Sequence, residues 1–112
     1  MPFENILAGI AVSDMEAARA WYSAFFDRPP DRVPMETDME WDFPGGSTVQ
    51  VFGDSKRAGS SSVTLVPDDL EVEMARLAEL GHQPKERSSG KFEIAIFEDV
   101  DANRIVLAKP TW

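Results

Sequence analysis

The chain has 112 residues, about the length of one small domain, and 43% of them are hydrophobic, which is enough for a packed core. Its 20 acidic and 11 basic residues give a net charge of −9, so we expect no binding to the phosphate backbone of nucleic acids. There is no cysteine, no apolar run long enough to cross a bilayer and no secretory signal in the first residues. We therefore expect a cytoplasmic protein without disulfides or membrane contact.

The first half of the chain predicts a strand, a helix and a hairpin. Residues 6–12 alternate between two sets of side chains, and the larger, even-numbered set is expected to face the helix. A capping box formed by Ser13 and Glu16 predicts the start of that helix. Its expected core face consists of Met15, Ala18, Tyr22 and Phe25. A turn at residues 44–46 then joins the two strands of the hairpin, and prolines at 29, 30 and 34 indicate a short edge strand before it.

Acidic and mostly apolar residues alternate between residues 36 and 43. The acids are Glu36, Asp38, Glu40 and Asp42. If this stretch is one strand, the apolar residues Met39, Trp41 and Phe43 should pack on the helix, because burying four carboxylates there would cost too much desolvation energy. The acids would then line the other face of the sheet. Alternatively, a turn near Thr37 or Asp38 breaks the alternation and leaves the acids as a solvated rim.

The second half repeats this plan at an offset of 55 or 56 residues. A strand near Val63 and Leu65 precedes a helix, for which Asp68 and Glu71 form the capping box and Gly81 suits the left-handed residue after the end. The expected core face of this helix consists of Leu70, Met74, Leu77 and Leu80. A second hairpin follows, with strands near residues 91–99 and 104–108.

These elements predict an α+β fold made of two βαβββ modules in a single domain. Module one spans residues 1–53, a linker spans 54–60, and module two spans 61–112. Neither module alone could bury both its helix and its sheet. We therefore expect the two sheets to lie side by side and curl into an open cup, with the helices outside and a cavity inside.

Two such modules resemble the vicinal oxygen chelate superfamily, which includes glyoxalase I, extradiol dioxygenases and bleomycin-resistance proteins. The matching segments are ILAGIAVSDMEAARAWYSAFF, VTLVPDDLEVEMARLAELG and EDVDANRIVL. The last segment is similar to the family's acid-Pro-Asp-Gly-Asn turn, with Val100 in place of the proline and Ala102 in place of the glycine. The resemblance covers nearly the whole chain and implies a glyoxalase/bleomycin resistance-like fold.

The residues at the family's metal-ligand positions do not predict a metal site. The metal-dependent members take ligands from the first and last strands of each module, and the matching positions here are Leu7, Gln50, Ser62 and Val106. Only Gln50 could ligate, whereas zinc, iron or manganese requires several imidazole or carboxylate ligands. The single histidine, His82, follows the predicted helix end and is expected in a solvated loop. We therefore predict no metal and no other cofactor.

The remaining candidate is a small-molecule site on the inner faces of the cup. The predicted ligand-binding residues are Glu40, Asp42, Thr48, Gln50, Phe52, Ser62, Thr64 and Val106. The positions equivalent to the acids in module two are Phe92, Ile94 and Ile96, so one wall would be acidic and the other apolar. An apolar cavity with a few polar groups suits a small organic molecule, and the acids favour a cation.

The sequence therefore predicts a metal-free binding protein, and the resemblance implies a homodimer in which the partner subunit completes the cup. No nucleophile with a base is specified, so no catalytic residue is assigned and a binder is favoured over an enzyme. Two alternatives stay open. One is a metal-dependent lyase, isomerase or dioxygenase of the same superfamily with displaced ligands, and the other is a regulatory or assembly module whose cavity is filled.

Overall fold

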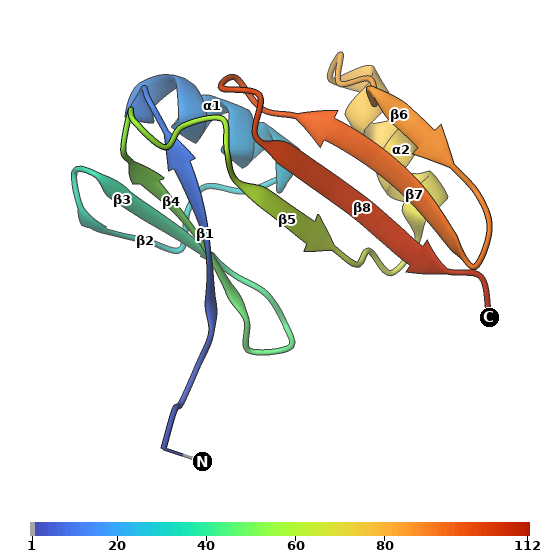
Figure 1. Ribbon diagram of the computed structural model, residues 1–112, viewed down its shortest axis with the longest axis horizontal. Helices are drawn as coiled ribbons and strands as arrows, with labels where there is room; N and C mark the ends of the chain where they lie inside the picture. The colour runs from blue at the N-terminus through green and yellow to red at the C-terminus, as the bar shows by residue number, and fades with distance from the viewer. Residues whose placement is uncertain (1) are drawn as a thin grey trace.

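A computed structural model describes residues 2–112, which form two four-stranded sheets and two helices (Figure 1). The first module contains β1 (Leu7–Val12), α1 (Met15–Phe25), β2 (Arg32–Met35), β3 (Asp38–Asp42) and β4 (Thr48–Gly53). The second contains β5 (Ser62–Leu65), α2 (Leu70–Glu79), β6 (Glu86–Ser88), β7 (Phe92–Glu98) and β8 (Arg104–Pro110). No helix in this part of the chain is long and apolar enough to span a membrane.

Both modules have the same strand topology. The order is β1-β4-β3-β2 in the first sheet, called sheet one, and β5-β8-β7-β6 in the second, called sheet two. In each sheet the first and last strands of the module pair in parallel, and the other neighbours pair antiparallel. This topology confirms the predicted α+β fold of two βαβββ modules.

Both helices are capped one residue later than the predicted capping boxes require. The caps are Asp14 and Asp69, whose carboxylates accept hydrogen bonds from the amides three residues later, at 3.0 and 3.2 Å. The prediction of Ser13 and Asp68 as caps is therefore wrong. The Ser13 hydroxyl instead donates to the carboxylate of Asp101 in the other module, at 2.5 Å.

Two side chains expected in the core are exposed because their elements are shorter than predicted. Ile6 precedes the first residue of β1 and is 80% exposed, and Leu80 follows the last residue of α2 and is 51% exposed. The prediction of both as core residues is wrong. Gly81 does have a positive φ of 87°, so its predicted left-handed conformation is confirmed.

The acidic stretch contains both a turn and a strand. Glu36 and Thr37 form the turn between β2 and β3, so the alternation is broken there, as one of the two alternatives predicted. Beyond the turn, the three acids of β3 alternate with Met39 and Trp41, which are buried in the core as expected. The three acids consequently share the face of sheet one that points away from the helices.

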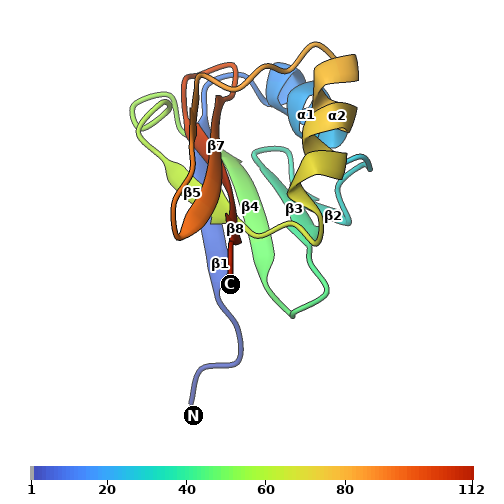
Figure 2. The same ribbon diagram turned by 90° about the vertical axis from the view of Figure 1, so that its right-hand side faces the viewer.

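A single hydrophobic core contains side chains from both modules. The ring of Phe25 in α1 packs edge-on against Phe97 in β7, with ring centroids 5.4 Å apart. Arg76 in α2 donates to the carbonyl oxygens of Ala24 and Phe25 at the end of α1, at 3.0 and 2.5 Å. The end of α1 therefore lies beside α2 and contacts sheet two (Figure 2). In this respect the chain differs from the expected arrangement, in which both helices lie outside a cup.

The two sheets meet where β1 ends and β5 begins. The amide of Ala11 donates to the Ser61 hydroxyl at 3.0 Å, and the Asn103 side chain donates to the Ala11 carbonyl at 2.8 Å. From this junction the two strands diverge (Figure 1). The helix-facing sides of the two sheets are therefore incompletely packed against each other, and a cavity remains between them.

Candidate functional site

The turn between β7 and β8, which carries the family-like segment, joins the two modules. Asp99 accepts hydrogen bonds from the Tyr22 hydroxyl at 2.6 Å and from the Asn103 side chain at 2.9 Å. Asn103 is fully buried and also contacts Ala11 of module one. Burial, followed by the hydrogen bond to Asp99, raises the pKa of Tyr22 well above its ordinary value, so this hydroxyl stays protonated. Because these buried polar groups are all paired with one another, the turn is structural.

Three carboxylates lie together on the face of sheet one that points away from the helices. These residues, Asp38, Glu40 and Asp42, form the acidic cluster. Asp38 and Glu40 are each only 8% exposed, so they are not a solvated rim. The strand register places Glu40 beside Gln50, and Asp42 beside Thr48. Four of the predicted ligand-binding residues are therefore neighbours on one surface.

Hydrogen bonds connect the acidic cluster to its neighbours. Arg32 in β2 donates to Glu40 at 2.8 Å and to Asp42 at 2.9 Å. The Gln50 amide donates to both Asp38 and Glu40, at 3.3 Å each, and the Thr48 hydroxyl donates to Asp42 at 2.9 Å. One guanidinium thus faces three carboxylates, so the cluster keeps an excess of negative charge when all three are ionised.

In the acidic cluster, Asp38 has a carboxylate oxygen that accepts no hydrogen bond among the described residues. This oxygen, Oδ1, is buried. Burial raises the pKa of Asp38 above its usual value, and Glu40 adds to the rise, whereas the Gln50 hydrogen bond and the Arg32 charge oppose it. A buried oxygen without a donor is uncommon in folded proteins and indicates a place where a donor can bind.

Sequence reasoning missed Asp38 and Arg32 as site residues. Asp38 belongs to the same alternation as Glu40, so the pattern could have included it. Arg32 lies in the edge strand β2, where the pairing with β3 shifts between Arg32 and Met35. Such an irregularity cannot be read from the sequence pattern, because the alternation of side chains assumes regular pairing.

The predicted residues of module two lie on the corresponding face of sheet two. Thr64 pairs with Val106, and Ser62 lies at the start of the same strand as Thr64. Ile94 and Ile96 are half-buried on this face, as the expected apolar wall requires. Phe52, the last predicted residue, lies on sheet one and covers Gly9, with 3.1 Å between its ring and the place of a Cβ there. Within one chain the two walls belong to different sheets and do not enclose a common cavity.

Large apolar side chains on the same two faces are exposed. Leu7 and Met35 on sheet one are 43% and 61% exposed, and Phe92 on sheet two is 40% exposed. Trp112 is 80% exposed and its ring packs edge-on against Phe92, with centroids 5.0 Å apart. Exposed large apolar groups on the faces that carry the predicted binding residues are typical of a surface that another molecule covers.

The residues at the family's metal-ligand positions do not fit a divalent ion. Gln50 is engaged by the acidic cluster, and Leu7, Ser62 and Val106 offer neither imidazole nor carboxylate. Between residues 2 and 112, no three histidine, aspartate or glutamate side chains are grouped so that they could hold a metal ion. No metal-dependent step is therefore proposed for this chain.

His82 lies in the loop after α2, as predicted, but it is half-buried rather than solvated. Its ring packs edge-on against Trp21 and Phe25, with centroids 5.2 and 6.1 Å apart. Burial, followed by the nearby charge of Arg76, lowers the pKa of His82. The expectation of a solvated side chain is therefore wrong, and His82 belongs to the packing between α1 and α2.

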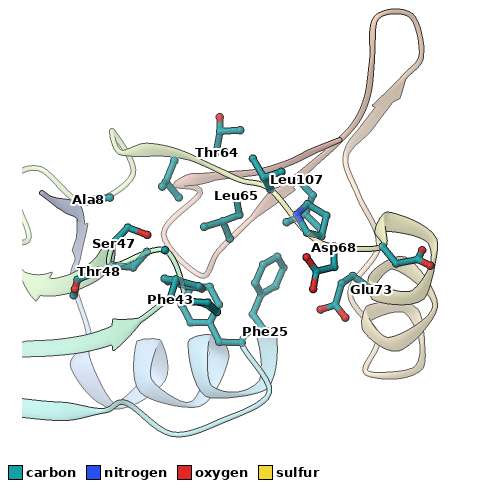
Figure 3. A pocket seen from close by; sticks show the side chains of 18 of the residues that line it. Ala8, Phe25, Phe43, Ser47, Thr48, Thr64, Leu65, Asp68, Glu73 and Leu107 are labelled. Carbon is teal, nitrogen blue, oxygen red and sulfur yellow. The ribbon is translucent and has the colours of Figure 1, made fainter. Parts of the chain in front are cut away.

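A cavity of about 750 Å³ lies between the modules on the helix-facing side of the sheets, and we call it the inter-module cleft. Phe25, Phe43, Leu65 and Leu107 supply much of its apolar wall (Figure 3). Two of the predicted site residues, Thr48 and Thr64, border it. The cavity lies on the side of the sheets opposite to the one that the sequence predicted.

No protein-family model and no curated protein matches this sequence. Solved structures do match its fold. A glyoxalase/bleomycin resistance protein from Catenulispora acidiphila has a TM-score of 0.88 and 26% identity, over 94% of this chain and 96% of that one. An antibiotic-binding protein from a Streptomyces species, TnmS3, has a TM-score of 0.80 and 22% identity, over 99% of both chains. A glyoxalase/bleomycin resistance protein from Albidiferax ferrireducens has a TM-score of 0.70 and 17% identity, over 92% and 95%. The chain therefore has the fold of glyoxalase/bleomycin resistance proteins, consistent with the vicinal oxygen chelate superfamily.

Proposed function

We propose that this protein binds a small organic cation at the acidic cluster, without a metal ion, in a cup that a second copy of the chain completes. The observation that carries the proposal is the buried Oδ1 of Asp38, which has no hydrogen-bond donor. A cation with N–H groups would supply both the missing donor and the missing positive charge. Charge-assisted hydrogen bonds of this kind are stronger than neutral ones.

The arrangement around Asp38 favours a flat cation with more than one N–H group. Asp38 and Glu40 both accept from the same Gln50 nitrogen, at 3.3 Å each, so their carboxylates lie within reach of one ligand head group. Phe52 occupies the neighbouring position on β4 and offers an apolar surface to the rest of the ligand. A neutral molecule of the same shape would leave the charge of the cluster uncompensated.

A second copy of the chain is the proposed cover of the site. The exposed apolar side chains Leu7, Met35 and Phe92 lie on the same two faces as the predicted ligand-binding residues. If sheet two of the partner subunit faces sheet one, the acidic and apolar walls enclose one cup and these side chains are buried. The fold of the antibiotic-binding Streptomyces protein, which is shared over 99% of both chains, supports small-molecule binding as the function class.

The test is a calorimetric titration with benzamidine, an aromatic amidinium, against benzamide, its neutral analogue. We expect saturable binding of benzamidine and not of benzamide, and about tenfold weaker benzamidine binding after Asp38→Asn. Glu79→Gln, at the exposed end of α2, removes the same charge away from the cluster and should leave the affinity unchanged. Equal binding of the two compounds, or equal effects of the two substitutions, would contradict the proposal.

A further inference from the structure

The inter-module cleft is a second cavity, separate from the acidic cluster. Val49 on the helix-facing side of β4 lines the cleft, whereas Gln50, the next residue, bonds to the acidic cluster on the opposite face. The sheet itself therefore separates the two places. A volume of about 750 Å³ lies in the usual range for the binding site of a drug-sized molecule.

The wall of the cleft is mostly apolar and partly aromatic. Phe25 and Leu107 are almost completely buried behind it, and Phe43 and Leu65 are half-buried at its surface. Figure 3 shows these side chains around the middle of the cavity. Apolar groups on several sides would bury the body of a ligand, and the rings would favour a flat one.

The polar groups of the cleft lie at its two ends. Ser47 lies at one end, and Asp68 and Glu73 lie at the other, beside the ring of Phe25 (Figure 3). The serine hydroxyl is neutral, whereas the other end is acidic. The cleft is therefore amphipathic along its length.

The acidic end has one carboxylate that is free to bind a cation. Glu73 pairs with Arg76 at 3.0 Å, and the Asp69 carboxylate caps α2. Asp68 makes no side-chain hydrogen bond or ion pair within residues 2–112, and its carboxylate borders the cavity. With Arg76 as the one basic residue that lines the cleft, the three acids there leave an excess of negative charge.

We propose that the inter-module cleft is a second ligand site, which binds a planar amphipathic organic cation. The apolar body lies between Phe25, Phe43 and Leu65, and the cationic end lies at Asp68. This proposal does not depend on the acidic cluster, because no residue of its acidic end belongs to that site.

The probe is berberine, a planar cationic dye whose fluorescence rises in apolar surroundings, titrated into the intact protein. We expect saturable binding to the wild-type protein and about tenfold weaker binding after Val72→Trp, because the new ring fills the cleft. Val72 is 59% exposed, so the fold should tolerate the change. Leu80→Trp is the matched control. Leu80 directly follows α2, the helix that contains Val72, and is similarly exposed, but it does not line the cleft.

The charge is tested separately. Asp68→Asn should weaken berberine binding about threefold, and Glu79→Gln should not change it. The anionic dye 1-anilinonaphthalene-8-sulfonate should bind worse than berberine to the wild-type protein. Asp38→Asn should leave berberine binding unchanged, so failure of this proposal and failure of the acidic-cluster site are distinguishable.

Several results would overturn the proposal. These are unsaturable berberine fluorescence, equal affinities of the Val72→Trp and Leu80→Trp variants, and preference for the anionic dye. A change in subunit number after Val72→Trp, measured by native mass spectrometry, would also overturn it, because the cleft would then be a protein interface. If the Val72→Trp variant does not fold, Val66→Trp takes its place with the same expected loss, because Val66 also lines the cleft and is 70% exposed.

Discussion

At the scale of single residues, Asp38 costs folding stability, and we propose that it contributes to ligand binding. A carboxylate that is 92% buried and has an oxygen without a donor destabilises the folded chain. Such a residue is expected where a ligand supplies what the protein does not. Asp99, another buried carboxylate, shows the opposite case, because each of its oxygens accepts hydrogen bonds.

Asp38→Asn should therefore stabilise the free protein near neutral pH. The pKa of Asp38 is raised in the folded chain, so its protonated form contributes stability that is complete below the usual pKa of aspartate and is lost as pH rises through the raised value. We expect the variant to be more stable by about 1 kcal/mol at about pH 7, and equal to the wild type at about pH 3.

Urea denaturation at both pH values measures this difference. The groups that face Asp38 are Glu40, Gln50 and Arg32, and they are the same in both proteins. A variant that is less stable than the wild type at neutral pH would show that Asp38 already has its partner within the chain.

The sequence could predict part of the candidate site and not the rest. Alternation placed Glu40, Asp42, Thr48 and Gln50 on one face correctly, because side chains in a regular strand point to alternate sides. It could not show that Asp38 is buried without a donor. That property depends on Arg32, which lies across an irregular pair of strands.

At the scale of elements, one buried side chain makes several of the hydrogen bonds that join the modules. Asn103 accepts hydrogen bonds from the amides of Gly59 and Ser61, both at 2.9 Å, and donates to the carbonyl of Ala11. It thereby connects the linker, β1 and the turn before β8. The family-like turn therefore helps to hold the two sheets together.

Asn103→Ala should consequently destabilise the protein by about 3 kcal/mol, because it removes the partner of two half-buried amides and of the buried Ala11 carbonyl, and one of the donors to Asp99. Asn5→Ala is the control, since Asn5 is exposed and bonds only to the adjacent amide. Thermal and urea unfolding of the two variants measures the effect. A loss of less than about 1 kcal/mol for Asn103→Ala would mean that the junction is held by other contacts.

The elements themselves were largely predictable, whereas their mutual arrangement was not. Helix positions follow from acidic caps and apolar spacing, and both helices lie where the pattern predicted them within one or two residues. The relation between the sheets depends on bonds such as the one from Asn103 to Ala11, which joins residues 92 positions apart. Periodicity carries no information about such contacts, so the expected position of the helices outside a cup differed from the observed one.

At the scale of the whole molecule, the two faces of each sheet have different roles. The helix-facing sides share one core, and the cleft occupies the space that this core leaves unfilled. The opposite faces carry the acidic cluster, the apolar wall and the exposed apolar side chains. In the proposed dimer, each chain would contribute the acidic wall to one cup and the apolar wall to the other.

Native mass spectrometry of the protein with benzamidine tests this account most directly, because it reports subunit number, bound ligand and metal in one spectrum. We predict a complex of two chains that retains benzamidine and no divalent metal ion, and a loss of the retained benzamidine after Asp38→Asn. A monomer, a complex that retains benzamide equally well, or a stoichiometric metal ion would contradict it.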